Sequence, residues 1–495
     1  MDNKLSYKVI MKNNMPKITT SKWLLLLIAA AIYITTNLTT VKTAASENEE
    51  IPGWVSFQEK ELKTSDKKVF ELSDKHVIYK DGKGKTLWES KEDYLVQDEF
   101  ITDIDRNGDE ELILLLWKKG RYGKDKPFWV KGDEDSFSQH IGIYDIGSEG
   151  KVSAKWFASD IGRQVTRMKL MEKDNAILLT EDIDENCALW MWESFGLKNI
   201  NNEVKFIAFG DNIIHEEIYQ YAVRKEKGSY DFLYKPFKKE IEEADIAAIA
   251  AETILVDKNS AVSGYPSFGS PLAVGEAIKN AGFDIAVCAN NHALDKGIYG
   301  IDVTTDFYKE NKITCVGIQN SSDKEYKPYE IISRNGIRFA LFSYTYGTND
   351  IDVADKYPFA VHYLPRTDAE KKKVIGDIDK AGKEADFIVV FVHWGDEYSK
   401  DISKEQKEMA ELFSKTEADV IIGTHPHVVQ KTELIDKEDG GKLLVYYSLG
   451  NFRADQGKDK ATKTGEEAIF YVAHTYDGVR LKKWETKELN SYWKE

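Results

Sequence analysis

From Val204 onward, the chain alternates short apolar runs with segments that have the period of amphipathic helices. Residues 273–281 have this period and precede the apolar run 284–288, and the segments 367–382 and 404–416 precede apolar runs in the same way. Such an alternation is typical of βαβ units, in which a helix connects two parallel strands. It therefore predicts an α/β domain, and it constrains the fold more than any other feature of the sequence.

Five of the apolar runs are followed closely by residues that can bind a metal ion. Parallel strands bring their carboxyl ends to one edge of a sheet, where open α/β sheets bind ligands. Mixed carboxylate, amide and imidazole ligands suit Zn, Mn or Fe, so we predict a site for one or two divalent transition-metal ions. The set contains four of the nine histidines, and its members are Asp211, Glu252, Asn290-Asn291-His292, His393, and His425 with His427.

The strongest single signal is Gly423-Thr424-His425-Pro426-His427, which lies directly behind the apolar run 419–422. A β-branched run of this kind is typical of a buried parallel strand, so both imidazoles should lie where the strand opens into a loop. Neutral imidazole is the commonest transition-metal ligand, and Pro426 fixes its own φ, which helps to hold the two rings in a set relation. A hydrogen-bonding role for these strand-end histidines is the alternative.

Seven short motifs follow one another between residues 204 and 475. They are Gly210-Asp211, Glu252-Thr253, Ser263-Gly264-Tyr265-Pro266, Ala289-Asn290-Asn291-His292-Ala293-Leu294-Asp295, His393-Trp394-Gly395-Asp396-Glu397-Tyr398, Gly423-Thr424-His425-Pro426-His427 and Tyr447-Ser448-Leu449-Gly450-Asn451-Phe452. Their order and spacing resemble the CapA family of poly-γ-glutamate capsule biosynthesis proteins, which belongs to the calcineurin-like metallophosphatase superfamily. The resemblance implies a four-layer α/β/β/α metallophosphatase-like sandwich, with two metals between the carboxyl-end loops of its sheets.

The resemblance also implies which residues bind the metals. Asp211 would be the ligand after the first strand, and Glu252 stands where a carboxylate would bridge the two ions. One metal would be bound by Asn291, His393 and His425, and the other by His427.

The chain departs from the family pattern at several positions. Ile213 stands where the superfamily usually has a histidine, and His215 either compensates for it or has a loop or packing role. Ala250 stands where the family commonly has an asparagine, so the first metal site is expected to be weak or empty. Asn451 is expected to be a structural turn residue rather than a ligand.

Two functions from different classes follow from these motifs. In the first, the metals lower the pKa of a bound water that attacks a phosphoester or related bond, while His292, oriented by Asp295, acts as the acid. In the second, the domain is a non-catalytic accessory subunit that binds the anionic polymer or membrane partners during synthesis and export. We rank the hydrolase-like domain of capsule or cell-envelope polymer biosynthesis first.

The first fifty residues predict a membrane-targeting segment. The run 23–41 carries no charge, and its length is close to the roughly 20 residues that span a bilayer. Lysines precede the run and acidic residues follow it, which places everything downstream outside the cell. We favour a retained single-pass anchor in the cell membrane with an extracellular domain, and the alternative is a secreted protein cleaved near Thr43-Ala44-Ala45.

Residues 51–200 contain short β runs separated by turn residues, which predicts a β-rich module. A weak repeat of about seventy residues relates 69–116 to 141–179 and is reminiscent of propeller blades, although two copies are too few to close a propeller. Residues 476–495 are expected to form a C-terminal strand and tail.

An acidic turn within this module places side-chain oxygens at every second residue. Short loops wrap Ca²⁺ in this way, and Gly108 permits a sharp turn. A hairpin turn that binds no ion is the alternative. The residues that would bind calcium are Asp103, Asp105, Asn107 and Asp109.

The composition excludes some classes of partner. A formal net charge of −16 argues against a general nucleic-acid binder, because such proteins need basic patches to displace counterions from phosphate. An anionic polymer or phosphoester substrate would therefore need a metal or a local basic pocket. Three cysteines cannot form a disulfide framework, so we expect buried free thiols.

Overall fold

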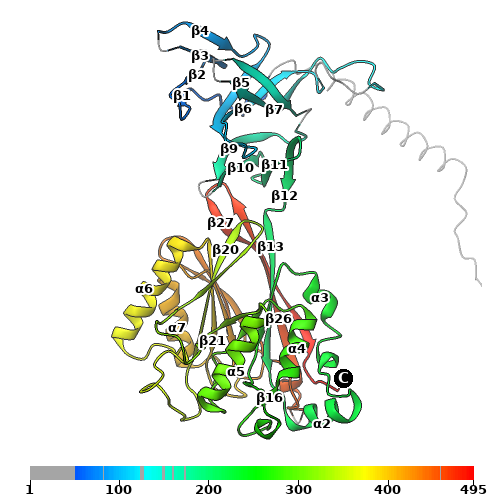
Figure 1. Cartoon of the computed structure of the whole chain (residues 1–495), viewed down its shortest axis with the longest axis vertical. Coiled ribbons are helices and arrows are strands. Elements are labelled where there is room, and N and C mark those ends of the chain that lie inside the picture. Colours follow the sequence, from blue (N-terminus) through cyan, green and yellow to red (C-terminus); the bar gives the residue numbers. More distant parts are fainter. Residues whose placement is uncertain are drawn as a thin grey trace, which may run out of the picture. The chain divides into compact units, whose positions relative to one another are not determined.

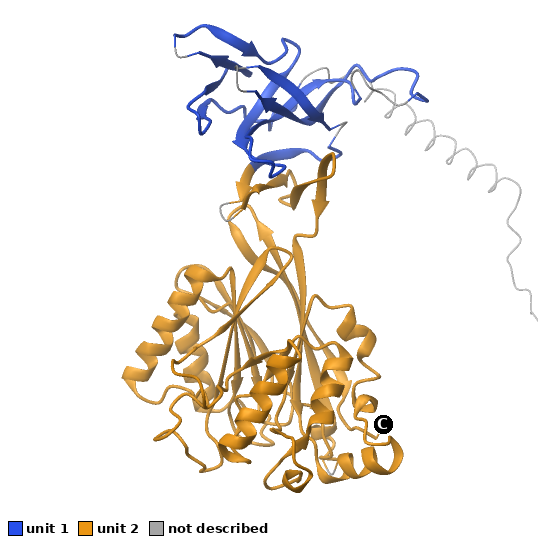
Figure 2. Cartoon of the chain, viewed as in Figure 1, with its two compact units in different colours: residues 1–168 blue, residues 169–495 orange. Residues whose placement is uncertain are grey.

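A computed structural model describes residues 51–81, 83–122, 128–147, 151–158, 161–171, 174–457 and 459–494. The predicted membrane segment lies outside these residues. Among the helices of the described ranges, none is both long enough and apolar enough to cross a bilayer. The chain divides into two compact units, residues 1–168 and 169–495, which are coloured separately in Figure 2.

The first unit contains two four-stranded antiparallel sheets in which consecutive strands are neighbours. Alternate side chains of these strands form one apolar core, in which Phe70 stacks on Tyr79 with ring centroids 4.8 Å apart. The strands are β1 (Lys60–Lys63), β2 (Val69–Ser73), β3 (His76–Lys80), β4 (Thr86–Glu89), β5 (Leu95–Thr102), β6 (Glu111–Lys119), β7 (Phe137–Ile146) and β8 (Val152–Phe157).

A third four-stranded sheet follows, with strands β9 (Val165–Met171), β10 (Asp174–Asp182), β11 (Cys187–Glu193) and β12 (Gly196–Ile200). The described strands between residues 60 and 200 form three four-stranded sheets, so the repeating unit is the four-stranded sheet. The predicted copy 69–116 cuts across two sheets. The second unit begins at Lys169, whose side chain donates a hydrogen bond to the backbone carbonyl of Tyr476 in the same unit.

The second unit contains a seven-stranded sheet in the order β18-β17-β14-β13-β26-β27, with β25 also paired to β13. The first four strands are mutually parallel, whereas β26 pairs antiparallel with β13, and β27 pairs antiparallel with β26. The predicted C-terminal strand is therefore an edge strand of this sheet. The strands are β13 (Glu203–Asn212), β14 (Ile246–Ala250), β17 (Ile285–Val287), β18 (Thr314–Val316), β25 (Asn451–Arg453), β26 (Thr464–Thr475) and β27 (Gly478–Asn490).

A six-stranded sheet has the order β19-β20-β21-β22-β24-β23, with four parallel strands between antiparallel edges. A separate two-stranded sheet pairs β15 with β16. The strands of both are β15 (Leu255–Val256), β16 (Ser270–Pro271), β19 (Glu330–Arg334), β20 (Ile337–Thr345), β21 (Phe387–His393), β22 (Val420–Thr424), β23 (Thr432–Asp436) and β24 (Lys442–Tyr446).

The two large sheets pack face to face, and helices cover their outer faces (Figure 1). Successive side chains of a strand point to opposite faces, so Phe206 of β13 contributes to the core between the sheets while Ile207 packs under the helices. In the central core, Phe206 stacks on Phe470 at 4.6 Å. The layers thus run helix, sheet, sheet, helix, in a mixed α/β fold of the kind that the alternating pattern predicted.

The helices begin and end close to the predicted positions because their caps are encoded locally. Thr367 and Glu370 form a capping box before α6, and Ser403 and Gln406 form another before α7. Gly282 ends α4 with a φ of 100°. The helices are α2 (Glu216–Lys225), α3 (Lys238–Glu242), α4 (Leu272–Ala281) and α5 (Gly297–Glu310) on one side, and α6 (Asp368–Glu384) and α7 (Lys404–Ser414) on the other.

Candidate metal centre

The predicted ligands come from the carboxyl ends of strands in both large sheets. Asp211 lies at the end of β13, and Glu252 follows β14. His393 is the last residue of β21, which is paired in register with β22, so that His393 lies opposite Thr424. His425 is the residue directly after Thr424, so it lies next to the strand partner of His393. The two sheets pack face to face, and this brings their polar strand ends together.

A first ligand group surrounds His393. Its Nε2 lies 3.0 Å from Asn291 Oδ1, 3.1 Å from His425 Nδ1 and 3.6 Å from Glu252 Oε1. Glu252, His393 and His425 each direct one potential ligand atom into a space less than 4.8 Å across. The structure thus brings together the residues predicted to bind one metal.

A second ligand group surrounds Asp211. His427 Nδ1 lies 3.1 Å from Asp211 Oδ2 and 3.8 Å from Glu252 Oε2. The backbone N–H of His425 also donates to Asp211 Oδ2, over 3.1 Å. Glu252 belongs to both groups, with one oxygen toward each, as a bridging carboxylate would.

Three carboxylate oxygens in this centre have no hydrogen-bond partner, although both side chains are fully buried. They are Asp211 Oδ1 and the two oxygens of Glu252. Burying a carboxylate without a compensating partner costs several kcal/mol, of the order of 2–7 kcal/mol even for a neutral polar group. A divalent cation in each of the two groups would supply the missing partners, so the residues present fit a metal centre.

The imidazoles are held in the form that binds metals. Burial, followed by the neighbouring imidazoles, lowers the pKa of His393 well below its ordinary value. Burial lowers the pKa of His425 to about 3. In contrast, burial and then the Asp211 carboxylate raise the pKa of Glu252 well above its ordinary value. Both histidines are therefore neutral at pH 7 and can offer a lone pair to a metal.

Hydrogen bonds and backbone geometry fix the ligands in place. Thr424 Oγ1 lies 3.0 Å from His393 Nδ1, which leaves His393 Nε2 facing the centre. His425 and His427 have φ values of 99° and 58°, in the left-handed region that non-glycine residues rarely adopt. Gly423 is required for close packing, because a Cβ there would lie 2.1 Å from the Tyr447 carbonyl oxygen.

His292 lies at the edge of the centre but belongs to none of the ligand groups found in the described residues. Its Nδ1 lies 2.7 Å from Asp295 Oδ2, and its ring meets the Phe268 ring edge-on at 4.7 Å. Asp295 also accepts the backbone N–H of Phe268. This arrangement fixes the ring and leaves Nε2 unengaged by Asp295, as the predicted acid and its orienting carboxylate require.

Two other candidate ligands make hydrogen bonds to residues outside the two ligand groups. His215 Nδ1 accepts the backbone N–H of Asp455 over 3.2 Å, and burial lowers its pKa to about 4. His215 therefore has the loop and packing role, and Ile213 is buried among Phe268 and Ala454. Asn451 Nδ2 donates to Gln456 Oε1 and to the Thr462 carbonyl, which fits the structural turn role.

Sequence reasoning missed two residues of this region. Glu397, on the loop between β21 and α7, forms a third possible ligand group with His425 and His427. Asn349 Oδ1 accepts from Asn291 Nδ2 over 3.4 Å, which directs the Asn291 oxygen toward His393. Glu397 was visible as an acidic residue four positions after His393, but no periodic pattern marks either residue.

The acidic turn in the first unit is already neutralised in part. Lys155 Nζ lies 2.5 Å from Asp105 and 2.6 Å from Glu111, a residue that the sequence did not single out. Asp103 accepts the backbone N–H groups of Asn107 and Gly108, both over 2.9 Å. Calcium would have to compete with the Lys155 ammonium group. Calcium binding by this turn stays a prediction.

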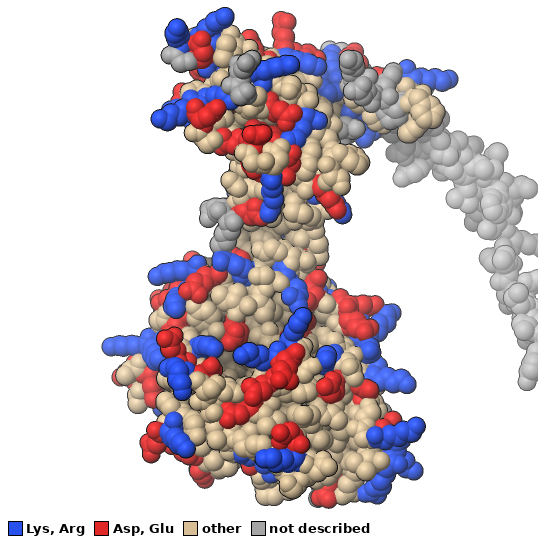
Figure 3. Space-filling model, in the orientation of Figure 1, with Lys and Arg blue, Asp and Glu red and all other residues tan. Residues whose placement is uncertain are grey.

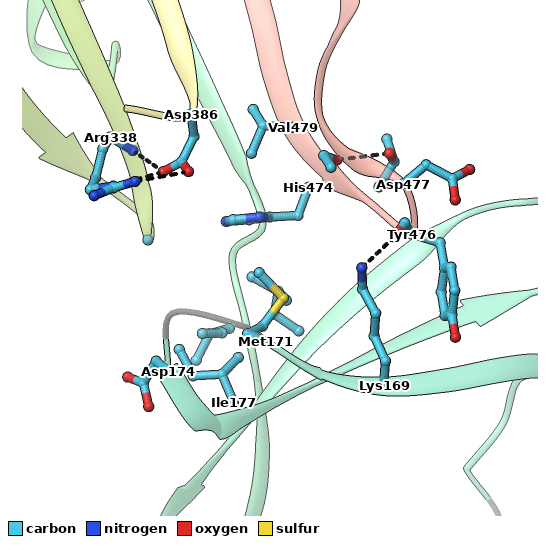
Figure 4. A pocket seen from close by; sticks show the side chains of 15 residues that line it. Lys169, Met171, Asp174, Ile177, Arg338, Asp386, His474, Tyr476, Asp477 and Val479 are labelled. Atoms are coloured by element: carbon cyan, nitrogen blue, oxygen red, sulfur yellow. Dashed lines mark hydrogen bonds and ion pairs between the residues drawn. The ribbon is translucent and has the colours of Figure 1, made fainter. Parts of the chain in front are cut away.

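Described residues of the second unit line several cavities, two of which are large. One, of about 610 Å³, borders the candidate centre, because Tyr346 lines it and also packs on His425 with ring centroids 4.6 Å apart. The other, of about 870 Å³, lies at the opposite end of β21, next to Asp386 (Figure 4). Figure 4 shows the His474 side chain between the Arg338–Asp386 ion pair and Met171. This second cavity contains no residue of the candidate centre.

Comparison with known proteins places the second unit in a family. Residues 205–456 match the family described as "Bacterial capsule synthesis protein PGA_cap". Because this match spans about half of the chain, the chain belongs to that bacterial capsule synthesis family. The resemblance predicted from the motifs is thereby confirmed.

Two curated relatives have similar sequences. The "PGA biosynthesis protein CapA" of Bacillus subtilis (strain 168) is 34% identical over 197 residues, which are 39% of this chain and 48% of the relative. The "Capsule biosynthesis protein CapA" of Bacillus anthracis is 33% identical over 196 residues, which are 39% of this chain and 45% of the relative. The chain thus spans about half the length of the curated relatives it matches.

Among solved structures, the calcineurin-like phosphoesterase YfkN from Bacillus subtilis has a TM-score of 0.33 and 14% identity, covering 58% of this chain and 91% of that chain. A phosphatase from Mycoplasma pneumoniae has a TM-score of 0.34 and 13% identity, covering 59% and 94%. The metal centre is therefore inferred from the geometry of its own residues and not from these structures.

Proposed function

We propose that this chain is a metal-dependent, metallophosphatase-like hydrolase that acts on a phosphoester or related bond in the biosynthesis of a capsule or cell-envelope polymer of the poly-γ-glutamate type. One observation carries this proposal: two ligand groups share Glu252 and lie beside a His292–Asp295 pair that belongs to neither group. Metal ligands without a neighbouring general acid would suit a structural metal, whereas metal ligands beside a candidate general acid suit hydrolysis.

The metal part of the proposal rests on chemistry that the residues present can support. One ion would be held by Glu252, Asn291, His393 and His425, and a second by Asp211, Glu252 and His427. Zn, Mn or Fe at these positions would polarise a phosphoryl oxygen and lower the pKa of a bound water.

The protein's own residues would move the proton and position the substrate. Asp295 accepts the hydrogen of His292 Nδ1 and stabilises the protonated ring, so that Nε2 can donate a proton to the departing oxygen. Tyr346 and Asn349 line the 610 Å³ cavity and also contact His425 and Asn291, so this cavity would receive part of the substrate.

We place the protein at the cell membrane, with its folded units outside the cell, held by an N-terminal anchor or secreted after cleavage. Its partners would be the anionic polymer or a phosphoester precursor, together with other subunits of synthesis and export. On the face of the second unit that Figure 3 shows, basic and acidic side chains are interspersed. Recognition of an anionic substrate would therefore depend on the metal centre rather than on a broad basic surface.

A non-catalytic accessory subunit is the second candidate. It is favoured by the burial of Ile213 and the hydrogen bond between His215 and Asp455, which leave the second ligand group without a further histidine from the segment after β13. A metal bound there would then serve to shape a surface for the polymer or a membrane partner.

One experiment separates the two functions. The full chain is stripped with a chelator, reloaded with Mn²⁺, Zn²⁺ or Fe²⁺, and assayed for bound metal and for hydrolysis of bis(p-nitrophenyl) phosphate and p-nitrophenyl phosphate. The hydrolase proposal expects turnover that depends on the metal. Stoichiometric metal without turnover of either ester would favour the accessory subunit, and a chain that binds no metal would refute the centre itself.

A further inference from the structure

Glu397 lies on the solvent side of the candidate centre. The carboxylate of this exposed residue offers one oxygen that lies within 4.8 Å of a nitrogen of His425 and a nitrogen of His427. These two histidines also belong to the two buried ligand groups. Glu397 therefore faces the centre from outside, beside the imidazoles of His425 and His427.

The backbone around Glu397 is fixed to the segment that carries those histidines. On one side, Trp394 N–H donates to the Thr424 carbonyl over 3.1 Å, and on the other Tyr398 N–H donates to the Pro426 carbonyl over 2.8 Å. Tyr398 itself has a φ of 63°. Non-glycine residues in this region persist only where the surroundings hold them, and they cluster at functional sites. The loop thus holds Glu397 beside the centre although its side chain is exposed.

The charge balance of the centre favours another carboxylate. Two divalent ions would bring four positive charges, while Asp211 and Glu252 supply two negative ones, so a third carboxylate would reduce the excess. Independent evidence for a cation comes from the buried oxygens of Asp211 and Glu252 that have no partner.

We infer that Glu397 is an additional metal ligand, which binds from the solvent side one of the ions that His425 and His427 would hold. This inference rests on the metal centre of the proposed function, but not on its catalytic step. A carboxylate oxygen is a suitable ligand for Zn, Mn or Fe alongside imidazole. Glu397 would be the solvent-exposed ligand of the centre, whereas the other ligands are buried.

The test compares Glu397→Gln with Asp396→Asn in the full chain. Each change removes one negative charge from the same exposed loop, but Asp396 belongs to none of the ligand groups among the described residues. Any loss caused by the surface charge alone will appear in both variants. Metal content and affinity are measured by equilibrium dialysis against a competing chelator with Mn²⁺ and with Zn²⁺. The rise in melting temperature on adding metal is measured in parallel.

We expect Glu397→Gln to bind metal at least about tenfold more weakly, with a smaller metal-induced rise in melting temperature, while Asp396→Asn behaves as the wild type does. Equal affinity in wild type and Glu397→Gln, or an equal loss in both variants, would overturn the inference and leave the proposed function standing. A wild-type chain that binds no metal would overturn both. Melting of the metal-free variants verifies that each is folded.

Discussion

Replacing His425 with alanine tests the centre of the proposed mechanism. The imidazole is buried, and its Nδ1 lies 3.1 Å from His393 Nε2 in the first ligand group. Its loss leaves Glu252 and His393 with their desolvation cost and one coordination bond fewer. Bound metal and stability should therefore fall together.

The size of the effect follows from mass action. Free metal at about 1,000 times Kd stabilises the native state by about 4.1 kcal/mol. If the variant binds about 100-fold more weakly, that stabilisation falls by about 2.7 kcal/mol. At roughly 2–4 °C per kcal/mol for a large domain, the metal-induced rise in melting temperature should shrink by about 5–10 °C. Calorimetry with and without Mn²⁺ or Zn²⁺ measures it directly.

Two further variants isolate the cause. His215→Ala also removes an imidazole, a half-buried one that contacts Asp455 and Phe268, so its metal binding should match that of the wild type. His425→Gly loses the same ligand as His425→Ala, but glycine adopts a φ of 99° without strain. Without metal, His425→Gly should therefore be more stable than His425→Ala by about 1 kcal/mol. Unchanged metal content in His425→Ala, or an equal loss in His215→Ala, would refute the assignment of His425 as a ligand.

Three other outcomes are expected. His292→Ala should retain its metal and its melting temperature but lose phosphoester hydrolysis, and a variant with wild-type turnover would remove His292 from the role of acid. Burial raises the pKa of Glu99 to about 8, and both its oxygens lack a partner. The pKa of Glu99 in the folded chain lies above its value in the unfolded chain, so its contribution to stability is lost as pH rises toward about 8. In urea denaturation, Glu99→Gln should therefore be more stable relative to the wild type at about pH 8 than at about pH 5. A stability difference that does not depend on pH would contradict the pKa shift. Lys155→Met should enlarge the rise in melting temperature of the full chain on adding millimolar calcium, because it frees Asp105 and Glu111, and no rise in either protein would leave only a hairpin turn.

Much of the centre could be predicted because strand-end chemistry is local in sequence. A buried apolar run followed by Asp211 or His393 indicates both a strand and the edge at which its last side chain lies. Capping residues such as Thr367 likewise set the helix boundaries within a few residues. These signals are encoded within a few positions of the residues that they place.

The remaining features depend on contacts between distant segments. Lys155 forms ion pairs with Asp105 and Glu111 from another strand of the sheet. The sequence of the acidic turn does not indicate that a lysine so distant in the chain lies beside it. Asn349 and Glu397 lie on loops, where apolar periodicity gives no information on position.

The pairing of β13 has a consequence for how the chain acquires its structure. This strand, the first of the second unit's large sheet, lies between β14 and β26, and Glu203 pairs with Ala473. One edge of β13 therefore has no sheet partner until nearly the whole chain is available. Non-local pairing of this kind slows folding and exposes an unpaired strand edge in the meantime. Loss of the last few dozen residues should thus yield an aggregating chain rather than a shortened domain, and a helper that shields β13 during synthesis would increase the yield of folded protein.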